Sequence, residues 1–337
     1  MNYPTIILIL PFSLFPITGK LKITAEERAS WFSHKAEIVK PHYYKVYLAD
    51  HDVTTEITPT ERAAVFRFTF PDNDSSFVLA DAFYQGSFIK IIPSENKILG
   101  YTTKNSGGVP GNFKNYFVII FDKSFDSAQV WSKDHIVEDI PELQDDHVGA
   151  AIRFITKKVE YIHARVASSF ISYEQAEENM KELGNDTFDE IKAKGRDIWN
   201  KELSRIKVEG GTDDQIKTFY SYLYRVLLFP RKFFELNKDG NIIHYSPYSG
   251  KVLPGYMFTA LNSLADLENQ RPVFNKTSLG TTKKSPGCFN KFKCFIYKNL
   301  SAFRTNPAAL CNCRISATGF CPGCGNIAAC SVGKLHH

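Results

Sequence analysis

The chain has 337 residues, of which 43% are hydrophobic and 14% aromatic, so it can bury a core and is not a disordered polypeptide. Its net charge is +5, but residues 260–337 contain 10 of the basic side chains and only 2 of the acidic ones, which leaves −3 for residues 1–259. The main body therefore lacks the basic character of a nucleic-acid-binding protein, and we expect no nucleic-acid partner.

The longest apolar run covers residues 6–15 and is interrupted by Pro11 and Ser13. A membrane-spanning helix needs about 20 apolar residues, so we expect no membrane span. A secretory signal peptide carries a basic residue before its apolar run, whereas the first lysine here is Lys20. The pattern therefore gives no clear signal peptide and favours a buried strand that ends at Pro11.

Short apolar or alternating runs, separated by turn residues, predict a strand-rich region from about residue 43 to residue 170. In residues 65–70, Phe66, Phe68 and Phe70 share one face, and Arg67 and Thr69 share the other. The other expected strands cover residues 43–50, 76–80, 87–92, 97–103, 116–121, 150–155 and 159–166. Because no helical pattern lies between them, they predict an antiparallel β-sandwich rather than a parallel α/β sheet.

Helical periodicity begins after residue 170, where three sequences have the spacing of a capping box. Ser172, Thr187 and Thr212 are each followed three residues later by Gln or Glu. The second helix carries apolar residues from Phe188 to Ile206. These signals predict three helix starts after the sandwich.

The third helix has a broad apolar stripe that ends before Pro230 and needs other helices to cover it. Beyond it, Asp239-Gly240 and Ser249-Gly250 predict the turns of a small hairpin through residues 242–245. We therefore expect an α+β multidomain chain. Its predicted parts are a β-sandwich (1–170), a helical linker (171–208), the start of a helical domain (209–259) and a Cys-rich basic tail (260–337).

Seven segments in this order resemble glycoside hydrolase family 92, the calcium-dependent exo-acting α-mannosidases. They are FSHK (32–35), PHYYKVYLAD (41–50), TERAAVFRFTFP (60–71), SSFISYEQAEENM (168–180), WNKELSRIKV (199–208), FYSYLYRVLLFPR (219–231) and HYSPYSGKVLPGYMFT (244–259). The resemblance implies an N-terminal β-sandwich, linker helices and a C-terminal (α/α)6 barrel, with the active site at their junction.

The resemblance further implies inverting, calcium-assisted removal of terminal α-linked mannose from N-glycans or mannans, in an extracellular or periplasmic location. Inverting hydrolysis needs a carboxylic acid that protonates the leaving oxygen and a carboxylate that activates water, about 6.5–9.5 Å apart. By the resemblance, both lie in the barrel beyond a D-x-G-F-W-D-T motif, which the residues after Thr259 do not match.

We therefore expect a fragment truncated at both ends and inactive as written, with no catalytic residue and no metal ligand to assign. The substrate-binding residues and the oligomeric state stay unknown at this stage. A non-catalytic carbohydrate-binding β-sandwich is the alternative function.

Adjacent acidic pairs are the candidates for a replacement acid and base within the chain. Neighbouring residues point to opposite faces of a strand and diverge by about 100° on a helix, so they are poorly placed to flank one sugar. We expect these pairs to be solvated loop or cap residues. The pairs are Asp145-Asp146, Glu138-Asp139 and Asp213-Asp214.

Single histidines and a group of aromatic residues are the remaining candidates. Arg231, Tyr248 and Tyr256 approach the family's pocket together with His244, but a structural role is favoured for each. No H-x-x-x-H or H-x-E spacing occurs, so we expect no zinc site in the body of the chain. The histidines considered are His34, His42, His135, His147, His163 and His244.

The tail contains all seven cysteines, which are Cys288, Cys294, Cys311, Cys313, Cys321, Cys324 and Cys330. Zinc ribbons pair two C-x-x-C knuckles across about 15–20 residues, whereas the first pair here is C-x-C. A zinc site, and with it a zinc-dependent adaptor function, stays an alternative, as does a disulfide framework. We favour a foreign or disordered tail produced by a frameshift or a misjoined exon.

Overall fold

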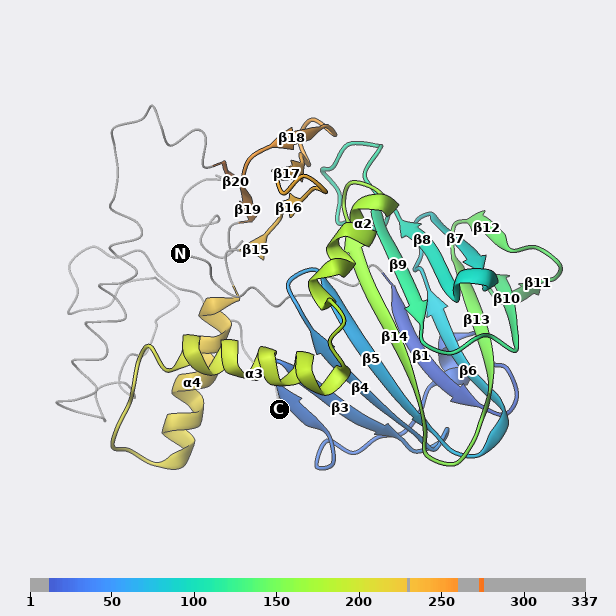
Figure 1. The fold of residues 1–337 in the computed structure, drawn as a ribbon, viewed down its shortest axis with the longest axis horizontal. Helices are drawn as coiled ribbons and strands as arrows, with labels where there is room; N and C mark the ends of the chain where they lie inside the picture. Colours follow the sequence, from blue (N-terminus) through green and yellow to red (C-terminus); the bar gives the residue numbers. More distant parts are fainter. Residues whose placement is uncertain (1–11, 229–230, 260–272, 276–337) are drawn as a thin grey trace, which may run out of the picture.

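The structure of this chain is a computed structural model, which describes residues 12–228, 231–259 and 273–275 (Figure 1). Among these residues, two antiparallel sheets pack face to face, which confirms the predicted β-sandwich. The larger sheet has, in spatial order, β12 (Glu142–Asp145), β7 (Ser87–Ile92), β8 (Lys97–Thr102), β9 (Asn115–Phe121), β14 (Glu160–Ser169), β5 (Ala63–Phe70), β4 (Val53–Pro59), β3 (Tyr43–Leu48) and β2 (Ile38–Lys40). The smaller sheet has β1 (Ser13–Thr18), β6 (Asn73–Asp81), β13 (Val148–Thr156), β10 (Ser127–Ser132) and β11 (His135–Val137).

Strand β5 shows why the two sheets face each other. Phe66, Phe68 and Phe70 are 6%, 0% and 1% exposed, and they belong to one apolar cluster with Val78 of β6 and Ile152 of β13. The predicted alternation along this strand is confirmed, because its aromatic face closes the space between the sheets.

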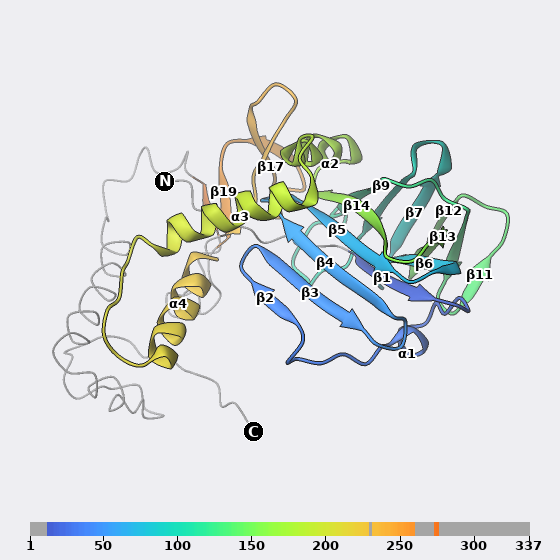
Figure 2. The same ribbon diagram turned by 60° about the horizontal axis from the view of Figure 1, so that its bottom comes forward.

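Helices cover the outer face of the larger sheet, so β5 is buried on both sides. The helical elements after the sandwich are α2 (Tyr173–Met180), the 3-10 turn η2 (Lys181–Leu183), α3 (Phe188–Leu203) and α4 (Asp213–Leu227). Phe188 and Ile191 of α3 pack with Tyr43, Ala63 and Val65 of the sheet in a second apolar cluster. Figure 2 shows the start of α3 against the sheet near β4 and β5, with the rest of the helix running beyond the sheet toward α4.

A charged cluster fixes α3 on the sheet. Arg67 contacts Glu56 of the neighbouring strand at 2.7 Å and Asp189 of α3 at 3.1 Å, and its guanidinium lies 4.1 Å from the Phe188 ring centroid. Burial favours a raised pKa for Glu56, but hydrogen bonds from Arg67 and Tyr43 outweigh it and hold that pKa below its ordinary value. The linker helix is therefore held at its N-terminal turn by a hydrogen-bonded ion pair.

The three predicted helix starts are confirmed, with one difference in detail. Thr187 with Glu190 and Thr212 with Gln215 form reciprocal capping boxes. Ser172 accepts a hydrogen bond from the Gln175 backbone N–H, but the Gln175 side chain donates to a distant partner described below.

The predicted hairpin beyond the helices is also confirmed. Strands β16 (Glu235–Leu236), β17 (Ile242–Tyr245) and β18 (Val252–Pro254) form a three-stranded antiparallel sheet. Gly240 and Gly250 have φ of 75° and 67°, the left-handed conformation that these turns require. A further sheet consists of β15 (Arg231–Lys232), β19 (Met257–Thr259) and β20 (Val273–Asn275).

The strand predicted to end at Pro11 lies outside the described residues, which begin at residue 12. Strand β1 begins at Ser13, after Pro11, and lies at the edge of the smaller sheet, where Pro16 is tolerated because an edge strand leaves one side of its backbone unpaired. Residues 1–11, Pro230 and the tail cysteines lie outside the described residues. No helix in the described part of the chain is long and apolar enough to cross a bilayer.

Packing in the sandwich core leads us to expect that one carbon added at Gly149 lowers the stability of the protein. A Cβ at Gly149 would lie 2.0 Å from Cζ2 of Trp131, which is 1% exposed, so Gly149→Ala should destabilise the protein by about 1–3 kcal/mol through overpacking. Gly111→Ala is the matched control, because no atom lies within 4 Å of the added carbon. Urea unfolding followed by fluorescence measures both, and equal midpoints for the two variants would contradict this packing.

Candidate functional site

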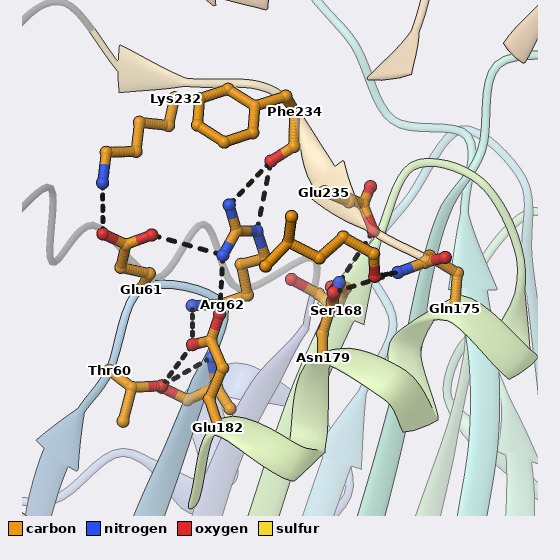
Figure 3. Close-up of polar contacts among 12 residues, drawn as sticks. Thr60, Glu61, Arg62, Ser168, Gln175, Asn179, Glu182, Lys232, Phe234 and Glu235 are labelled. Carbon is orange, nitrogen blue, oxygen red and sulfur yellow. Dashed lines mark hydrogen bonds and ion pairs between the residues drawn. The ribbon is translucent and has the colours of Figure 1, made fainter. Parts of the chain in front are cut away.

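Arg62 joins the sandwich to the segment that follows the helices (Figure 3). It lies in the turn between β4 and β5, and its Nε and Nη2 donate to the Phe234 carbonyl at 3.1 Å and 2.9 Å. Its Nη1 contacts Glu182 of η2 at 2.6 Å. One guanidinium thus ties together a sandwich turn, the linker and the first strands after α4.

Two neighbours of Arg62 extend this contact. Glu61 pairs with Lys232 of β15. Thr60 donates from its hydroxyl to Glu182 at 2.8 Å, and the Arg62 backbone N–H donates to the same carboxylate oxygen at 3.0 Å. Residues 60–62, the turn between β4 and β5, therefore carry three successive polar contacts with segments more than 100 residues away.

Glu235 follows Phe234 and is buried, with 5% of the residue exposed. Its carboxylate accepts hydrogen bonds from the Phe170 backbone N–H at 3.0 Å and from the Asn179 side-chain amide at 2.7 Å. Gln175, one turn before Asn179 on α2, donates to the Leu236 carbonyl at 2.6 Å. Helix α2 thus presents two carboxamides to strand β16, as Figure 3 shows.

The environment of Glu235 raises its pKa. Burial is the largest influence and favours the neutral form. Hydrogen bonds from Ser169, Asn179 and the Phe170 N–H, and the charge of Arg62, act in the opposite direction without outweighing burial. The Glu235 carboxyl therefore ionises at a higher pH than an exposed glutamate does.

The loop of residues 103–114, between β8 and β9, provides the second contact with these strands. The Asn112 side chain donates to the Gly250 carbonyl at 2.8 Å and accepts from the Tyr245 hydroxyl at 3.2 Å. The Phe113 ring centroid lies 5.8 Å from that of Phe170 and 6.0 Å from that of Tyr245. Polar contacts at residues 60–62 and aromatic contacts at this loop together position the β16–β18 sheet on the sandwich.

The acidic pairs considered from the sequence lie in three separate places. Asp145, at the end of β12, accepts from the Ser132 hydroxyl at 2.6 Å, which with the Asp146 N–H lowers its pKa. Glu138 and Asp139 are in the segment between β11 and β12, whereas Asp213 and Asp214 are exposed in the first turn of α4. The structure does not bring these pairs together around a pocket.

The histidines also lie apart from one another, each with its own partner. His244 is buried and its Nδ1 lies 2.9 Å from the Gly255 carbonyl oxygen. His34, His135, His147 and His163 contact Glu37, Asp134, Asp81 and Asp122, respectively, and the His42 carbonyl accepts from the Thr58 hydroxyl.

Of the residues near the expected pocket, Tyr248 is 61% exposed, whereas Tyr256 packs its ring 4.8 Å from that of Phe234. Arg231 pairs through its backbone with Thr259 in the β15–β19 sheet. No group of three or more His, Cys, Asp or Glu side chains within residues 12–228, 231–259 and 273–275 is arranged to hold a metal ion. These residues therefore do not fit a calcium site.

Sequence reasoning did not single out the residues that form the junction. Arg62, Gln175 and Asn179 lie within the segments that carry the family resemblance, but nothing local shows that they contact residues 234–236. The sequence did contain one signal of a shared contact surface. Gln175 and Asn179 are four residues apart, which places two carboxamides on one face of a helix.

Comparison with known proteins places the chain among glycoside hydrolases. The family model of the glycosyl hydrolase family 92 N-terminal domain matches residues 9–169, and that of the family 92 catalytic domain matches residues 175–267. A family 92 inverting mannosidase from Bacteroides thetaiotaomicron is 40% identical, with a TM-score of 0.72 over 75% of this chain and 34% of its own.

Two further relatives agree with this result. A family 92 α-mannosidase from the same bacterium, solved in complex with mannoimidazole, is 28% identical with a TM-score of 0.67 over 76% of this chain and 35% of its own. An uncharacterized secreted glycosidase from Arthroderma benhamiae is 23% identical over 64% of this chain and 31% of its own length. The chain thus spans about a third of the length of these relatives.

Removing the guanidinium should loosen the junction without unfolding the sandwich. Arg62→Ala removes this donor from the Phe234 carbonyl and from Glu182, and the lost hydrogen bonds to the part-buried carbonyl should cost about 1 kcal/mol or more. Hydrogen exchange should accelerate in residues 231–245 and stay unchanged in β5. Arg196→Ala, which removes an exposed arginine of α3, is the control, and equal exchange in the two variants would contradict the role of Arg62.

The raised pKa of Glu235 predicts a pH dependence of stability. The stabilisation is complete below the unfolded-state pKa and is lost as the pH rises through the higher folded-state pKa. Glu235→Gln mimics the neutral carboxyl, so the wild type should become less stable relative to this variant as the pH is raised from about 4 to about 8. Thermal midpoints across that range test this, with Glu138→Gln as an exposed control. Parallel wild-type and Glu235→Gln curves would refute it.

Proposed function

Because the chain belongs to glycosyl hydrolase family 92, we propose that it forms part of an enzyme that removes terminal α-linked mannose from N-glycans or mannans. The observation that carries this proposal is the match of both family domains, in order, along residues 9–267. It is supported by the fold shared with an inverting mannosidase at 40% identity. We further propose the division into sandwich (1–170), linker (171–208) and start of the catalytic domain (209–259).

In this proposal the described residues act as the scaffold of the active site. The turn of residues 60–62, helix α2 and the loop of residues 103–114 hold the β16–β18 sheet, which belongs to the segment matched by the catalytic-domain model. A proton donor and a water-activating carboxylate must flank the sugar at about 6.5–9.5 Å, so sub-ångström control of domain position matters for rate. Arg62 and Glu235 are positioning residues in this scheme.

The reaction proposed is hydrolysis with inversion at the anomeric carbon. One carboxylic acid protonates the departing glycosidic oxygen while a carboxylate accepts a proton from the attacking water on the opposite face. We assign both groups to the part of the catalytic domain that the relatives have beyond the segment described here. Calcium, which the family resemblance implies, would aid distortion of the sugar ring, and its ligands would also come from that part.

Secretion is part of the same proposal. A glycan-trimming enzyme meets its substrates outside the cytoplasm, and one curated relative is described as a secreted glycosidase. We therefore propose an extracellular or periplasmic location.

A chimera tests whether this chain can serve as the mannosidase scaffold. Residues 12–259 replace the matching segment of the inverting mannosidase from Bacteroides thetaiotaomicron, which is 40% identical to this chain. We expect the chimera to hydrolyse an aryl α-mannoside, to lose activity with a calcium chelator and to release β-mannose first, as followed by proton NMR. The 337-residue chain alone should release no mannose.

Two outcomes would count against the proposal. A folded chimera that binds but does not hydrolyse the mannoside would show that this scaffold does not support the reaction. Calcium-dependent turnover by the 337-residue chain alone would show that its own residues include the acid and base, which the assignment above places elsewhere.

A further inference from the structure

The turn between β6 and β7, residues 82–86, has a strained backbone. Phe83 and Gln85 have φ of 65° and 75°, a left-handed conformation that non-glycine residues rarely adopt. The turn is held by the Asp81 carboxylate, which accepts from the Phe83 N–H at 3.0 Å, and by Thr103, whose hydroxyl donates to the Gly86 carbonyl at 3.0 Å. Such a conformation persists because several contacts determine it.

A buried charge network supports this turn from beneath. Asp81 is 6% exposed and contacts both Arg28 of α1 (Ala25–Arg28) and His147, whose Nε2 lies 2.7 Å from the carboxylate. Burial favours a raised pKa for Asp81, but Arg28 and His147 outweigh it and hold that pKa below its ordinary value. The carboxylate therefore stays charged and fixes the His147 ring.

Tyr84 lies on this support with its side chain toward solvent. The residue is 57% exposed, and its ring centroid lies 4.2 Å from that of the buried His147 at an interplanar angle of 39°. The phenol ring thus rests at a tilt against the imidazole, while more than half of the residue is exposed to solvent. The next residue, Gln85, is exposed, and its carboxamide oxygen accepts from the Asn105 backbone N–H at 3.3 Å.

The position of this surface connects it to the junction. Asn105 lies in the loop of residues 103–114. In the same loop, Asn112 contacts Gly250, a residue of the segment matched by the catalytic-domain model. The Thr103 backbone N–H donates to the Gly86 carbonyl at 2.9 Å, so the turn of residues 82–86 lies against the start of this loop. Figure 1 shows this loop beside β17 and β18.

We propose that Tyr84 is a sugar-binding platform that contacts a mannose residue of the glycan. The C–H face of a pyranose packs on the negative face of an aromatic ring, and carboxamides can both donate to and accept from sugar hydroxyls. A ring fixed on one side by a buried imidazole loses little freedom on binding, which favours affinity. The identity of the ligand rests on the proposed function, whereas the binding surface itself rests on Tyr84, His147 and Asp81.

Calorimetry with an α-linked mannotriose and the 337-residue chain tests the proposal. We expect saturable binding by the wild type, affinity weakened about tenfold in Tyr84→Ala, and affinity within about twofold in Tyr84→Phe, which keeps the ring. Tyr47→Ala, at an exposed tyrosine of β3, is the control and should bind like the wild type. Urea unfolding establishes that each variant is folded, and saturation-transfer NMR on the wild type gives a second measure of sugar contact with aromatic protons.

The outcomes separate this inference from the proposed function. Equal affinity in the wild type and Tyr84→Ala, or no binding by the wild type, would overturn the platform. Failure of the chimera to hydrolyse mannosides, with Tyr84-dependent mannotriose binding intact, would overturn the proposed function and leave the platform standing.

Discussion

The contact between the Arg62 guanidinium and the Phe234 carbonyl is the constraint on which the arrangement of the two family segments depends. A side chain of the sandwich satisfies a main-chain acceptor 172 positions later, so strand β16 is positioned through its backbone. The same guanidinium engages Glu182, which compensates its charge in a site where the Arg62 side chain is only 12% exposed. Domain placement therefore depends on a few directed polar contacts as well as on apolar area.

Phe234, which immediately precedes β16, and Glu235, the first residue of β16, are held from two directions. The Phe234 carbonyl faces Arg62, whereas the Glu235 carboxyl faces Asn179 of α2, so the strand cannot slide without breaking one set of hydrogen bonds. The two sets differ in physical kind. Arg62 is charge-compensated by Glu182, but Glu235 is held by amide and hydroxyl donors, and this is why burial prevails and raises its pKa.

Local periodicity was sufficient to predict most of the strands, the three helix starts and the hairpin turns at Gly240 and Gly250, because these features depend on neighbours in sequence. Local periodicity failed where the hydrogen-bond partner of a side chain is distant in the sequence. At Ser172 the capping-box pattern predicted that Gln175 would return to the cap, yet this side chain donates to Leu236, 61 positions away. Asn179, Glu235 and Arg62 carry no local signal, since each is an ordinary polar residue until the tertiary fold brings them together. The strand expected to end at Pro11 stays a prediction, because it lies outside the described residues, whereas β1 includes Pro16 as an edge strand can.

The pKa values of two buried carboxyls, Asp81 and Glu235, are shifted in opposite directions, so the contacts that each one makes depend on pH in opposite ways. Asp81 is in contact with Arg28, so its pKa is lowered, and the network beneath Tyr84 loses stability only as the pH falls through that low value. Glu235 has a raised pKa, so the junction weakens as the pH rises. A fall in pH through the lowered pKa therefore acts on the Asp81 network, whereas a rise in pH acts on the junction. Because the segment matched by the catalytic-domain model is attached through that junction, a rise in pH would loosen its position on the sandwich while the network beneath Tyr84 stays intact.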